Sequence, residues 1–517
     1  MPFSLALAVA GLTGFVALSY EILWYRVFSF ASGGASAAFP LVIAAYLVGV
    51  AEGELAVHAF RARLRNKVNA FRAITAFSVS VPIVCFLVVP AFARLVGFTV
   101  WGWGLVLVGA STAALGAVVP IITSLVIASD EDGPSSPKIY GVNVIGAAIG
   151  ALVTGYALTS VLDTQAIATA LAVTGLATAG ITASAVLEGR ERRLWQSGIV
   201  VLAFSTVSFG SAMHRGVYER LLYKDRYQGQ RFERQLEGRQ GMVALTADHH
   251  VFGGGIYDGT AKIDLDADQN HLIRALAIPA IHASPRRVLV VGLSTGAWAQ
   301  TIANLPSVEA VTIVEANPAY RELLPLSPDV ASLLHNPKVH IVVDDARRWL
   351  ARNSHERFDV IVSNTTFNWR ASTSRLLSIE FMQLVRDRLA PTGVFYFNTT
   401  DVPEAYWSAF DVFPYGLRFQ NFAAVSMSPV GFDTDRWRRA LIQYRLDGVA
   451  PFDSATDVGR KRIVRFVSTP RDRAGWYGAP MLESRTAMLQ RLHRGSAITD
   501  DNMGLEWRTV YPAVYVP

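Results

Sequence analysis

Two glycines and three acidic residues stand at spacings that could bind a nucleotide. In VLVVGLSTGAWAQ, residues 288–300, an apolar run breaks at Gly292 and a helical pattern begins after Gly296. A glycine turn of this kind lets the backbone approach a ligand closely and points a helix N-terminus at it. Glu315 follows 19 residues after Gly296, at the end of the next apolar run, where an acid can bind ribose hydroxyls.

Asp344 and Asp345 end the third apolar run, VHIVV, and either carboxylate could accept a hydrogen bond from an adenine amino group. The turn is not the GxGxxG pattern of dinucleotide sites, because the third glycine is missing. The missing glycine and the second acid favour an adenosyl ligand over a dinucleotide. A plainer interpretation also stands, in which the glycines only form a tight turn and the acids only cap helices.

The elements that must position these residues are apolar strands that alternate with helical stretches. The strands are RVLVVG, AVTIVEA, VHIVVDD, FDVIVSN and GVFYFNT, and the order predicts a doubly wound, mainly parallel α/β sheet of the Rossmann-like kind. Ligands of such sheets bind at the carboxyl ends of the strands. Upstream, between Gln228 and Asp268, short alternating stretches with Gly and Asp turns predict a small β-hairpin subdomain.

The N-terminal part has the composition of a membrane protein. The chain is 51% hydrophobic and 17% charged, and apolar runs of about 20 residues, the length of a membrane span, recur from Leu5 to Leu187. They predict an α-helical transmembrane bundle with six spans, at residues 4–29, 36–60, 73–97, 101–128, 140–162 and 165–187. A seventh segment at 196–213 is rich in Ser and Thr and borderline in length, and we interpret it as an interfacial or partly inserted helix.

These patterns predict three domains. They are a transmembrane helical domain at 1–213, a linker with the β-hairpin subdomain at 214–270, and the α/β domain at 271–517. We expect a multi-pass protein of the plasma membrane, which is the inner membrane in a bacterium. The segment 61–72 has five basic residues and no acid, so the positive-inside rule places it in the cytoplasm. Six spans then leave the C-terminal domain in the cytoplasm, and a seventh would place it outside.

The charged residues and the possible metal ligands indicate which classes of partner the protein binds. The basic residues behind the net charge of +6 flank the spans and are spread over the C-terminal half without an aromatic-interleaved patch, which indicates a lipid bilayer rather than nucleic acid. The single Cys85 lies in an apolar run and the ten histidines form no ligand-spaced cluster, so we expect no metal site. Glu21 and Glu52, near span ends, either pair or snorkel there, or hold a polar substrate inside the bundle.

Several of these motifs resemble one known family. RRVLVVGLSTGAWAQTIANLPSVEAVTIVEANPAY, VDDARRWL and FDVIVSN resemble the spermidine synthase (polyamine aminopropyltransferase) family. GFVALSYEILWYRVFS and YGVNVIGAAIGALVTGYAL resemble the helices of its bacterial branch with N-terminal transmembrane helices. The resemblance implies a site for S-adenosylmethionine, its decarboxylated form or methylthioadenosine. By position, the cofactor-lining residues would be Gly292, Ser294 and Gly296, with Glu315 on the ribose and Asp345 and Ala346 at the adenine.

The chain departs from that family on the acceptor side. The family has an acid-rich loop like DSSDP after the fourth strand, and one of its aspartates helps to deprotonate the attacking amine. Here the loop reads SNTTFNWR, residues 363–370, with no acid, and neither Asn364 nor Thr365 can act as a base. An amine is protonated at neutral pH, so aminopropyl transfer needs such a base. This departure speaks against ordinary putrescine aminopropylation.

Other side chains border the acceptor pocket if the resemblance holds. Asp258 and His271 fall in that region, and together with Asn364 they are the candidate catalytic residues; His271 has the better intrinsic pKa for a general base. Trp369 and Arg370 would present an aromatic face and a cation to the acceptor. An acceptor beside Arg370 would be neutral or anionic rather than a polyamine.

Two functions follow from these residues. The first is a membrane-anchored transferase that binds an S-adenosyl-type nucleoside and alkylates an acceptor that the sequence does not identify. The second is a catalytically inactive sensor or scaffold coupled to a membrane bundle that binds or transports a small molecule. The first requires Glu315 and Asp345, whereas the second requires polar residues of the bundle such as Glu21 or Glu52. Both are compatible with a homo-oligomer.

Overall fold

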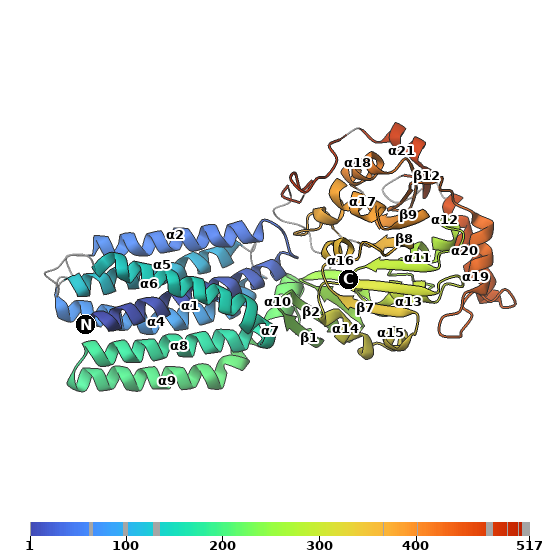
Figure 1. The fold of residues 1–517 in the computed structure, drawn as a ribbon. Coiled ribbons are helices and arrows are strands. Elements are labelled where there is room, and N and C mark those ends of the chain that lie inside the picture. The colour runs from blue at the N-terminus through green and yellow to red at the C-terminus, as the bar shows by residue number, and fades with distance from the viewer. Residues whose placement is uncertain are drawn as a thin grey trace. The chain divides into compact units, whose positions relative to one another are not determined.

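The computed structural model describes residues 2–60, 66–96, 102–127, 135–364, 367–400, 402–471, 479–493, 495–504 and 506–508. The chain forms two compact units (Figure 1). The first is helical and runs to Arg231, with Glu237–Met242 added. The second contains Phe232–Leu236 and the residues from Val243 onward.

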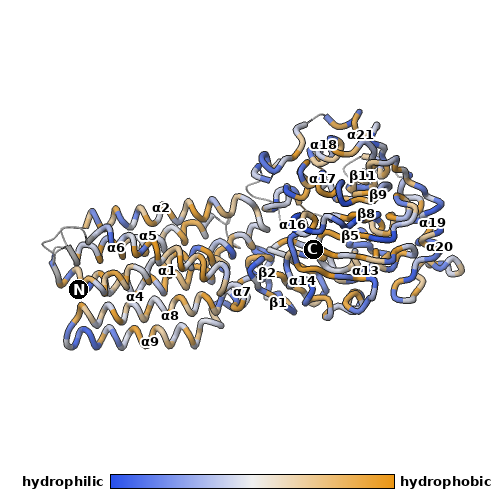
Figure 2. Tube along the Cα trace, viewed as in Figure 1, coloured by the Kyte–Doolittle hydropathy of each residue, from blue (hydrophilic) through white to orange (hydrophobic). Residues whose placement is uncertain are grey.

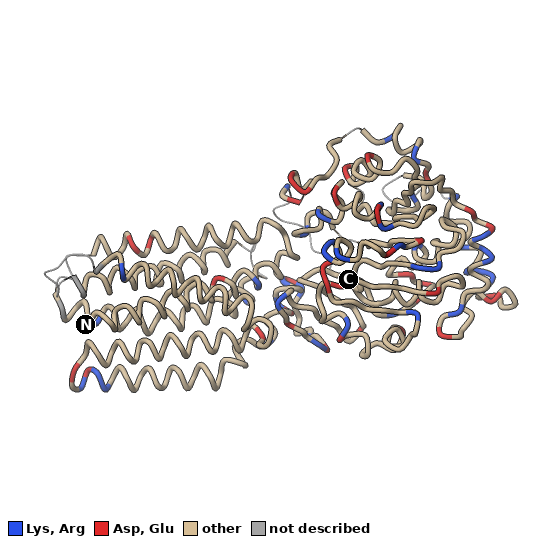
Figure 3. Tube along the Cα trace, viewed as in Figure 1, with Lys and Arg blue, Asp and Glu red and all other residues tan. Residues whose placement is uncertain are grey.

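Long apolar helices make up the first unit. They are α1 (Phe3–Ala31), α2 (Ala38–Ala59), α4 (Lys67–Leu95), α5 (Gly102–Ile127), α6 (Ser135–Leu152), α8 (Thr164–Val186) and α9 (Gly189–His214). Helix α6 continues through a π-helical turn, η1 (Val153–Leu158), into α7 (Thr159–Val161). In the described part of the chain, seven helices are long and apolar enough to cross a membrane. Hydrophobic residues run along them (Figure 2), and charged residues are sparse there (Figure 3). The predicted helical bundle is therefore confirmed as a set of membrane-length helices.

Glycines bring α1 and α6 into close contact. A Cβ at Gly146 would lie 2.0 Å from the carbonyl oxygen of Gly11, and one at Gly150 would lie 2.3 Å from that of Phe15. Asn143 Nδ2 also donates to the carbonyl of Ala10 at 2.9 Å. Without a Cβ, the two backbones approach closely, which is how helices associate inside a bilayer.

Helix α9, the seventh segment, has the length and direction of a span. At its start Glu191 accepts a hydrogen bond from Arg72 at 2.8 Å, and at its end the Met213 carbonyl accepts one from Arg94 at 3.2 Å. Arg72 and Arg94 stand at the two ends of α4, so α9 lies beside α4 over about 33 Å, since a helix rises about 1.5 Å per residue. This depth matches the roughly 30 Å of a hydrocarbon core. The geometry suits a seventh span and differs from the interfacial helix that we expected from its serines and threonines.

Two sheets form the framework of the second unit. The smaller one has four strands in the order β1 (Phe232–Gly238), β2 (Gly241–Thr246), β3 (His250–Gly253) and β4 (Ile256–Thr260), and β3 is antiparallel to β2 and β4. It occupies the segment in which we predicted β-hairpins. The larger sheet has the order β12-β10-β11-β9-β8-β5-β6-β7. Its strands are β5 (Arg287–Val291), β6 (Ala310–Glu315), β7 (Val339–Val343), β8 (Phe358–Ser363), β9 (Leu389–Asn398), β10 (Tyr415–Phe419), β11 (Phe422–Ser426) and β12 (Leu482–Ser484).

The larger sheet is doubly wound, as predicted. Strand β5 pairs in parallel with both β6 and β8, so the strand order reverses beside it. Strands β7 and β9 extend the parallel part, and β9, β11, β10 and β12 form an antiparallel end. The reversal at β5 makes the crevice at its carboxyl end the expected place for a ligand.

Helices cover both faces of this sheet (Figure 1). Val288 and Val290 of β5 pack into the apolar core of one face, and Leu289 and Val291 into that of the other. Burial on both faces explains why β5 reads as an unbroken apolar run. The helices of the first face are α11 (Leu272–Leu276), α12 (Ile278–Ile281), α13 (Ala297–Ala303), α14 (Ala319–Leu323), α15 (Pro328–Ala331), α19 (Thr434–Gln443) and α20 (Asp457–Ser468). Those of the second face are α16 (Ala346–Arg352), α17 (Ile379–Arg386), α18 (Pro403–Val412) and α21 (Arg485–Arg491).

Candidate functional site

The glycine turn lies at the carboxyl end of β5 and leads into α13. Gly292 has φ +89° and Gly296, the residue before α13, has φ +82°, in the left-handed region that favours glycine. A Cβ at Gly292 would meet no heavy atom within 4 Å, so the space above this residue is open. A Cβ at Gly296 would lie 2.5 Å from Leu324 Cδ2, so Gly296 is needed for packing. Only Gly292 therefore faces room for a ligand.

Glu315, at the end of β6, holds this turn. Its Oε2 accepts the backbone N–H of Leu293 and its Oε1 that of Asn317, both at 2.7 Å. The side chain is buried, and burial raises its pKa while the backbone N–H groups oppose that rise. The N–H of Ser294 is a third backbone donor to this carboxylate, and a carboxylate has about four lone-pair sites, so capacity for about one ribose hydroxyl is left. Glu315 does not cap a helix, so the plainer interpretation does not describe it.

Asp345 and Ala346 stand at the carboxyl end of β7, where α16 begins. Asp345 caps α16 by accepting the N–H of Arg348 at 2.9 Å, which is the plainer role considered for it. Its side chain is exposed, whereas Ala346 is buried. Asp344 is engaged by the side chain of Arg348 and by the N–H of Asp345, at 2.8 Å for the latter. These contacts use Oδ1 in both acids, and Asp345 is the more exposed of the two.

Asp258 and Arg370 come together in a buried cluster that we call the Asp258 cluster, with Tyr320 and Gly253. Asp258 Oδ2 accepts the hydroxyl of Tyr320, and Oδ1 lies 3.6 Å from Arg370 Nη1. Arg370 Nη2 donates to the Gly253 carbonyl at 3.1 Å. Burial raises the pKa of Asp258 and the charge of Arg370 opposes the rise. Sequence reasoning missed Tyr320, although its position just after the Glu315 strand was a usable signal.

The turn and the Asp258 cluster are neighbours. Ser294, inside the turn, donates its hydroxyl to the backbone oxygen of Asp258 at 3.0 Å. Gly253 is needed here because a Cβ would lie 1.7 Å from the Tyr320 hydroxyl oxygen and 2.3 Å from Asp258 Oδ2. The small sheet, through β3 and β4, thus packs beside the glycine turn at the carboxyl end of β5.

His271 and Asn364 lie in different surroundings. His271 precedes α11 with φ +51°, and burial, followed by the charge of Arg274, lowers its pKa to about 4. An imidazole with that pKa is neutral and weakly basic at pH 7, which suits a general base poorly. Asn364 Oδ1 accepts a hydrogen bond from Asn398 Nδ2 at 3.1 Å, in a network of neutral amides. Thr365 lies outside the described residues.

Trp369 lies in the same loop as Arg370. Its ring stacks on Phe367 with centroids 5.3 Å apart, and the side chain is half-buried. The structure thus shows that Trp369 stacks within its own loop, and its contact with an acceptor stays a prediction.

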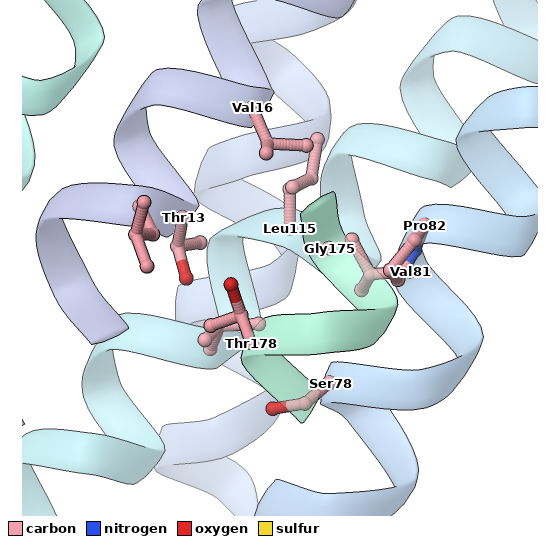
Figure 4. Close-up of a pocket in the computed structure, with 10 residues that line it drawn as sticks. Thr13, Val16, Ser78, Val81, Pro82, Leu115, Gly175 and Thr178 are labelled. Carbon is pink, nitrogen blue, oxygen red and sulfur yellow. The ribbon is translucent and has the colours of Figure 1, made fainter. Parts of the chain in front are cut away.

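The helical unit contains a small cavity among α1, α4, α5 and α8 (Figure 4). Its volume is about 30 Å³, close to the share of one water molecule in the liquid. Three hydroxyl groups lie around it, and two of them, on Thr13 and Thr178, donate to carbonyls of their own helices at 2.8 and 2.9 Å. A cavity of this volume has room for water but not for a nucleoside. The lining residues are Leu12, Thr13, Val16, Ser78, Val81, Pro82, Leu115, Val118, Gly175 and Thr178.

Comparisons with known proteins identify a family domain in this part of the chain. Residues 273–408 match the family model described as "Spermine/spermidine synthase domain". The polyamine aminopropyltransferase of Mycobacterium tuberculosis H37Rv is 33% identical over 147 residues, which are 27% of this chain and 28% of that protein. Polyamine aminopropyltransferase 2 of Streptomyces coelicolor is 24% identical over 319 residues, 57% of this chain and 55% of that protein. The chain therefore matches from about a quarter to just over half of the length of these relatives.

Among solved structures, spermidine synthase from Thermotoga maritima is similar with a TM-score of 0.33 and 20% identity, covering 47% of this chain and 84% of that one. The expected resemblance is confirmed by the family model and the curated relatives. The C-terminal part of this chain carries a spermine/spermidine synthase domain, related to the polyamine aminopropyltransferases, and that domain follows a region of long apolar helices.

Proposed function

We propose that the protein is a membrane-anchored transferase that binds an S-adenosyl-type nucleoside in the crevice above β5 and alkylates a small acceptor. The observation that carries this proposal is the turn at Gly292, which has open space above it and is held by Glu315 at the switch point of the sheet. Gly292, Ser294 and Gly296 would line the nucleoside, Glu315 would bind the ribose, and Asp345 with Ala346 would meet the adenine.

In the proposed reaction a lone pair of the acceptor attacks a carbon bonded to the sulfonium sulfur. The carbon–sulfur bond breaks, its electron pair stays on sulfur, and a neutral thioether nucleoside leaves. If the acceptor loses a proton, a base must take it. Of the candidates Asp258, His271 and Asn364, only Asp258 has a carboxylate, and that group is already engaged by Tyr320 and Arg370. This supports an acceptor whose attacking atom is unprotonated at neutral pH, in a neutral or anionic molecule.

Calorimetric titration of the purified full-length protein tests the proposal. The ligands are S-adenosylmethionine, its decarboxylated form and methylthioadenosine, with Asp345→Ala as the variant and Asp345→Ser as its matched control, because Ser keeps the helix cap. We expect saturable binding that Asp345→Ala and Asp345→Ser both weaken, since each removes the carboxylate. A folded protein that binds none of the three nucleosides would overturn the proposal.

A second function is favoured by the course of α9. If α4 crosses the bilayer, α9, which lies beside it over the same depth, crosses as well. The synthase domain would then stand on the side opposite to the basic segment 61–72, outside the cytoplasm by the positive-inside rule. Adenosyl nucleosides are made in the cytosol, so such a domain would act as a sensor or scaffold for the bundle and would not turn over substrate. Binding or transport of a small molecule by the helical bundle that survives Glu315→Ala but is lost with Glu21→Ala would support this second function.

A further inference from the structure

The Asp258 cluster presents two opposite charges side by side. Asp258 Oδ1 and Arg370 Nη1 are 3.6 Å apart, just beyond hydrogen-bonding distance. The Asp258 side chain is 6% exposed and the Arg370 side chain 29% exposed, so Arg370 is the more accessible member of the pair. A guanidinium has five N–H donors, and the contacts with Gly253 and Asp258 do not use them all. The Asp258–Arg370 pair can therefore bind a ligand while its two charges stay side by side.

With the nucleoside bound to the glycine turn as proposed above, the cluster lies close enough to the turn for a substituent on the sulfur to reach it. Ser294 joins the glycine turn to Asp258, and Tyr320 follows the strand that ends in Glu315. The negative charge of Asp258 also contributes to the raised pKa of Glu315, as expected for two carboxylates in one part of the domain. A tail that leaves the sulfur on this side meets Asp258 and Arg370 together.

The three candidate nucleosides differ in that tail. S-Adenosylmethionine has an α-amino and an α-carboxylate group, its decarboxylated form has the ammonium alone, and methylthioadenosine has neither. An ammonium next to Asp258 is also close to the positive charge of Arg370, which disfavours it. A carboxylate on Arg370 and an ammonium on Asp258 satisfy both charges at once.

We propose that the Asp258–Arg370 pair recognises an amino-acid head group, and that the nucleoside held by the glycine turn is S-adenosylmethionine rather than its decarboxylated form. This inference rests on the nucleoside site proposed above and makes Arg370 the residue that determines tail specificity. It also distinguishes the crevice from one that is built for diamines, because the net charge of the pair is zero before any ligand arrives.

The test compares the three nucleosides by calorimetry on the full-length protein. We expect the wild type to bind S-adenosylmethionine about tenfold or more tightly than the decarboxylated form, the value of one hydrogen bond to a charged group. Arg370→Gln should weaken the binding of S-adenosylmethionine by a similar factor and tighten the binding of the decarboxylated form. The affinity for methylthioadenosine should stay within about twofold of the wild-type value. Arg460→Gln, which removes an exposed ion pair with Asp457 on α20, is the matched control and should change none of the three.

Binding of methylthioadenosine, which has no charged tail, distinguishes an error in the nucleoside site from an error in the tail assignment. If it does not bind the wild type, the nucleoside site itself is wrong. If it binds and the wild type shows no preference between the other two, or Arg370→Gln weakens all three equally, only the tail assignment is overturned. A second variant, Asp258→Asn, should weaken both amine-bearing nucleosides and spare methylthioadenosine. A last outcome combines two results: L-methionine binds to protein that is saturated with methylthioadenosine, and the two tailed nucleosides bind equally well. The Asp258–Arg370 pair would then bind a free amino-acid acceptor, and the assignment of S-adenosylmethionine would be overturned.

Discussion

Exchanging Gly292 and Gly296 for alanine separately distinguishes a binding turn from a merely tight one. Both residues have positive φ, so an alanine at either position carries backbone strain of about 1–2 kcal/mol. At Gly292 the added methyl group meets no protein atom within 4 Å, and strain is the whole cost. At Gly296 the methyl group would lie 2.5 Å from Leu324 Cδ2, and overpacking adds about 1–3 kcal/mol.

The two variants should therefore separate stability from binding. Gly292→Ala should lower the thermal midpoint of the full-length protein in detergent by only a few degrees, because its cost is strain alone. Its methyl group occupies the space proposed for the nucleoside, so the affinity for methylthioadenosine should fall about tenfold or more, as expected for overpacking of about 1.4 kcal/mol. Gly296→Ala should lower the midpoint about twice as far.

Thermal unfolding and calorimetric titration of the same preparations measure both quantities. The reasoning would be refuted if Gly292→Ala lowered the midpoint as expected but bound methylthioadenosine within twofold of the wild type. The turn would then be only a tight connection between β5 and α13, and the open space above it would have another use.

Three further predictions concern the adenine end, the His271 segment and the membrane. Asp345→Ala should lose about 1 kcal/mol of stability through the lost cap, whereas Asp345→Ser should keep the cap but lose affinity for adenosyl ligands; equal affinity in Asp345→Ser and the wild type would place the adenine elsewhere. The pKa of His271 is about 4 against 6.5 unfolded, so the unfolded chain binds more protons and the free energy of unfolding rises with pH between these values. Burial raises the pKa of Asp268 from 3.8 to about 6, which has the opposite sign and loses stability as pH rises over nearly the same window. The contributions of His271 and Asp268 should therefore nearly cancel between about pH 4 and 6, and the midpoint of His271→Asn should fall relative to that of the wild type as pH rises; a constant difference between the two midpoints would contradict the assignment. Finally, with seven spans a phosphatase fused to the C-terminus should be active outside the cytoplasm and a phosphatase inserted in segment 61–72 inactive, while the reverse pattern at the C-terminus would leave α9 at the interface.

The sequence alone was enough to predict the elements that depend on local pattern. Apolar runs of about 20 residues could only be membrane-length helices, because a soluble helix is rarely hydrophobic on every side. The VLVV run of β5 had to be buried on both faces, and the glycine turn with Glu315 after the next strand placed a candidate site at the carboxyl edge of the sheet. Each of these inferences uses residues close together in the chain or a rule of connection between successive strands.

Contacts between distant residues were decided only by the tertiary structure. The segment at α9 was ambiguous from its serines and threonines, and contacts with Arg72 and Arg94, each 119 residues away along the chain, showed that it lies beside α4. Tyr320 lies 62 residues from Asp258 and could not be assigned to it by spacing, and the loop at Arg370 showed only that an acid was missing. Packing of the small sheet against the glycine turn brings Asp258, Tyr320 and Arg370 together. These residues come from distant parts of the chain, so they meet only when the whole domain has folded.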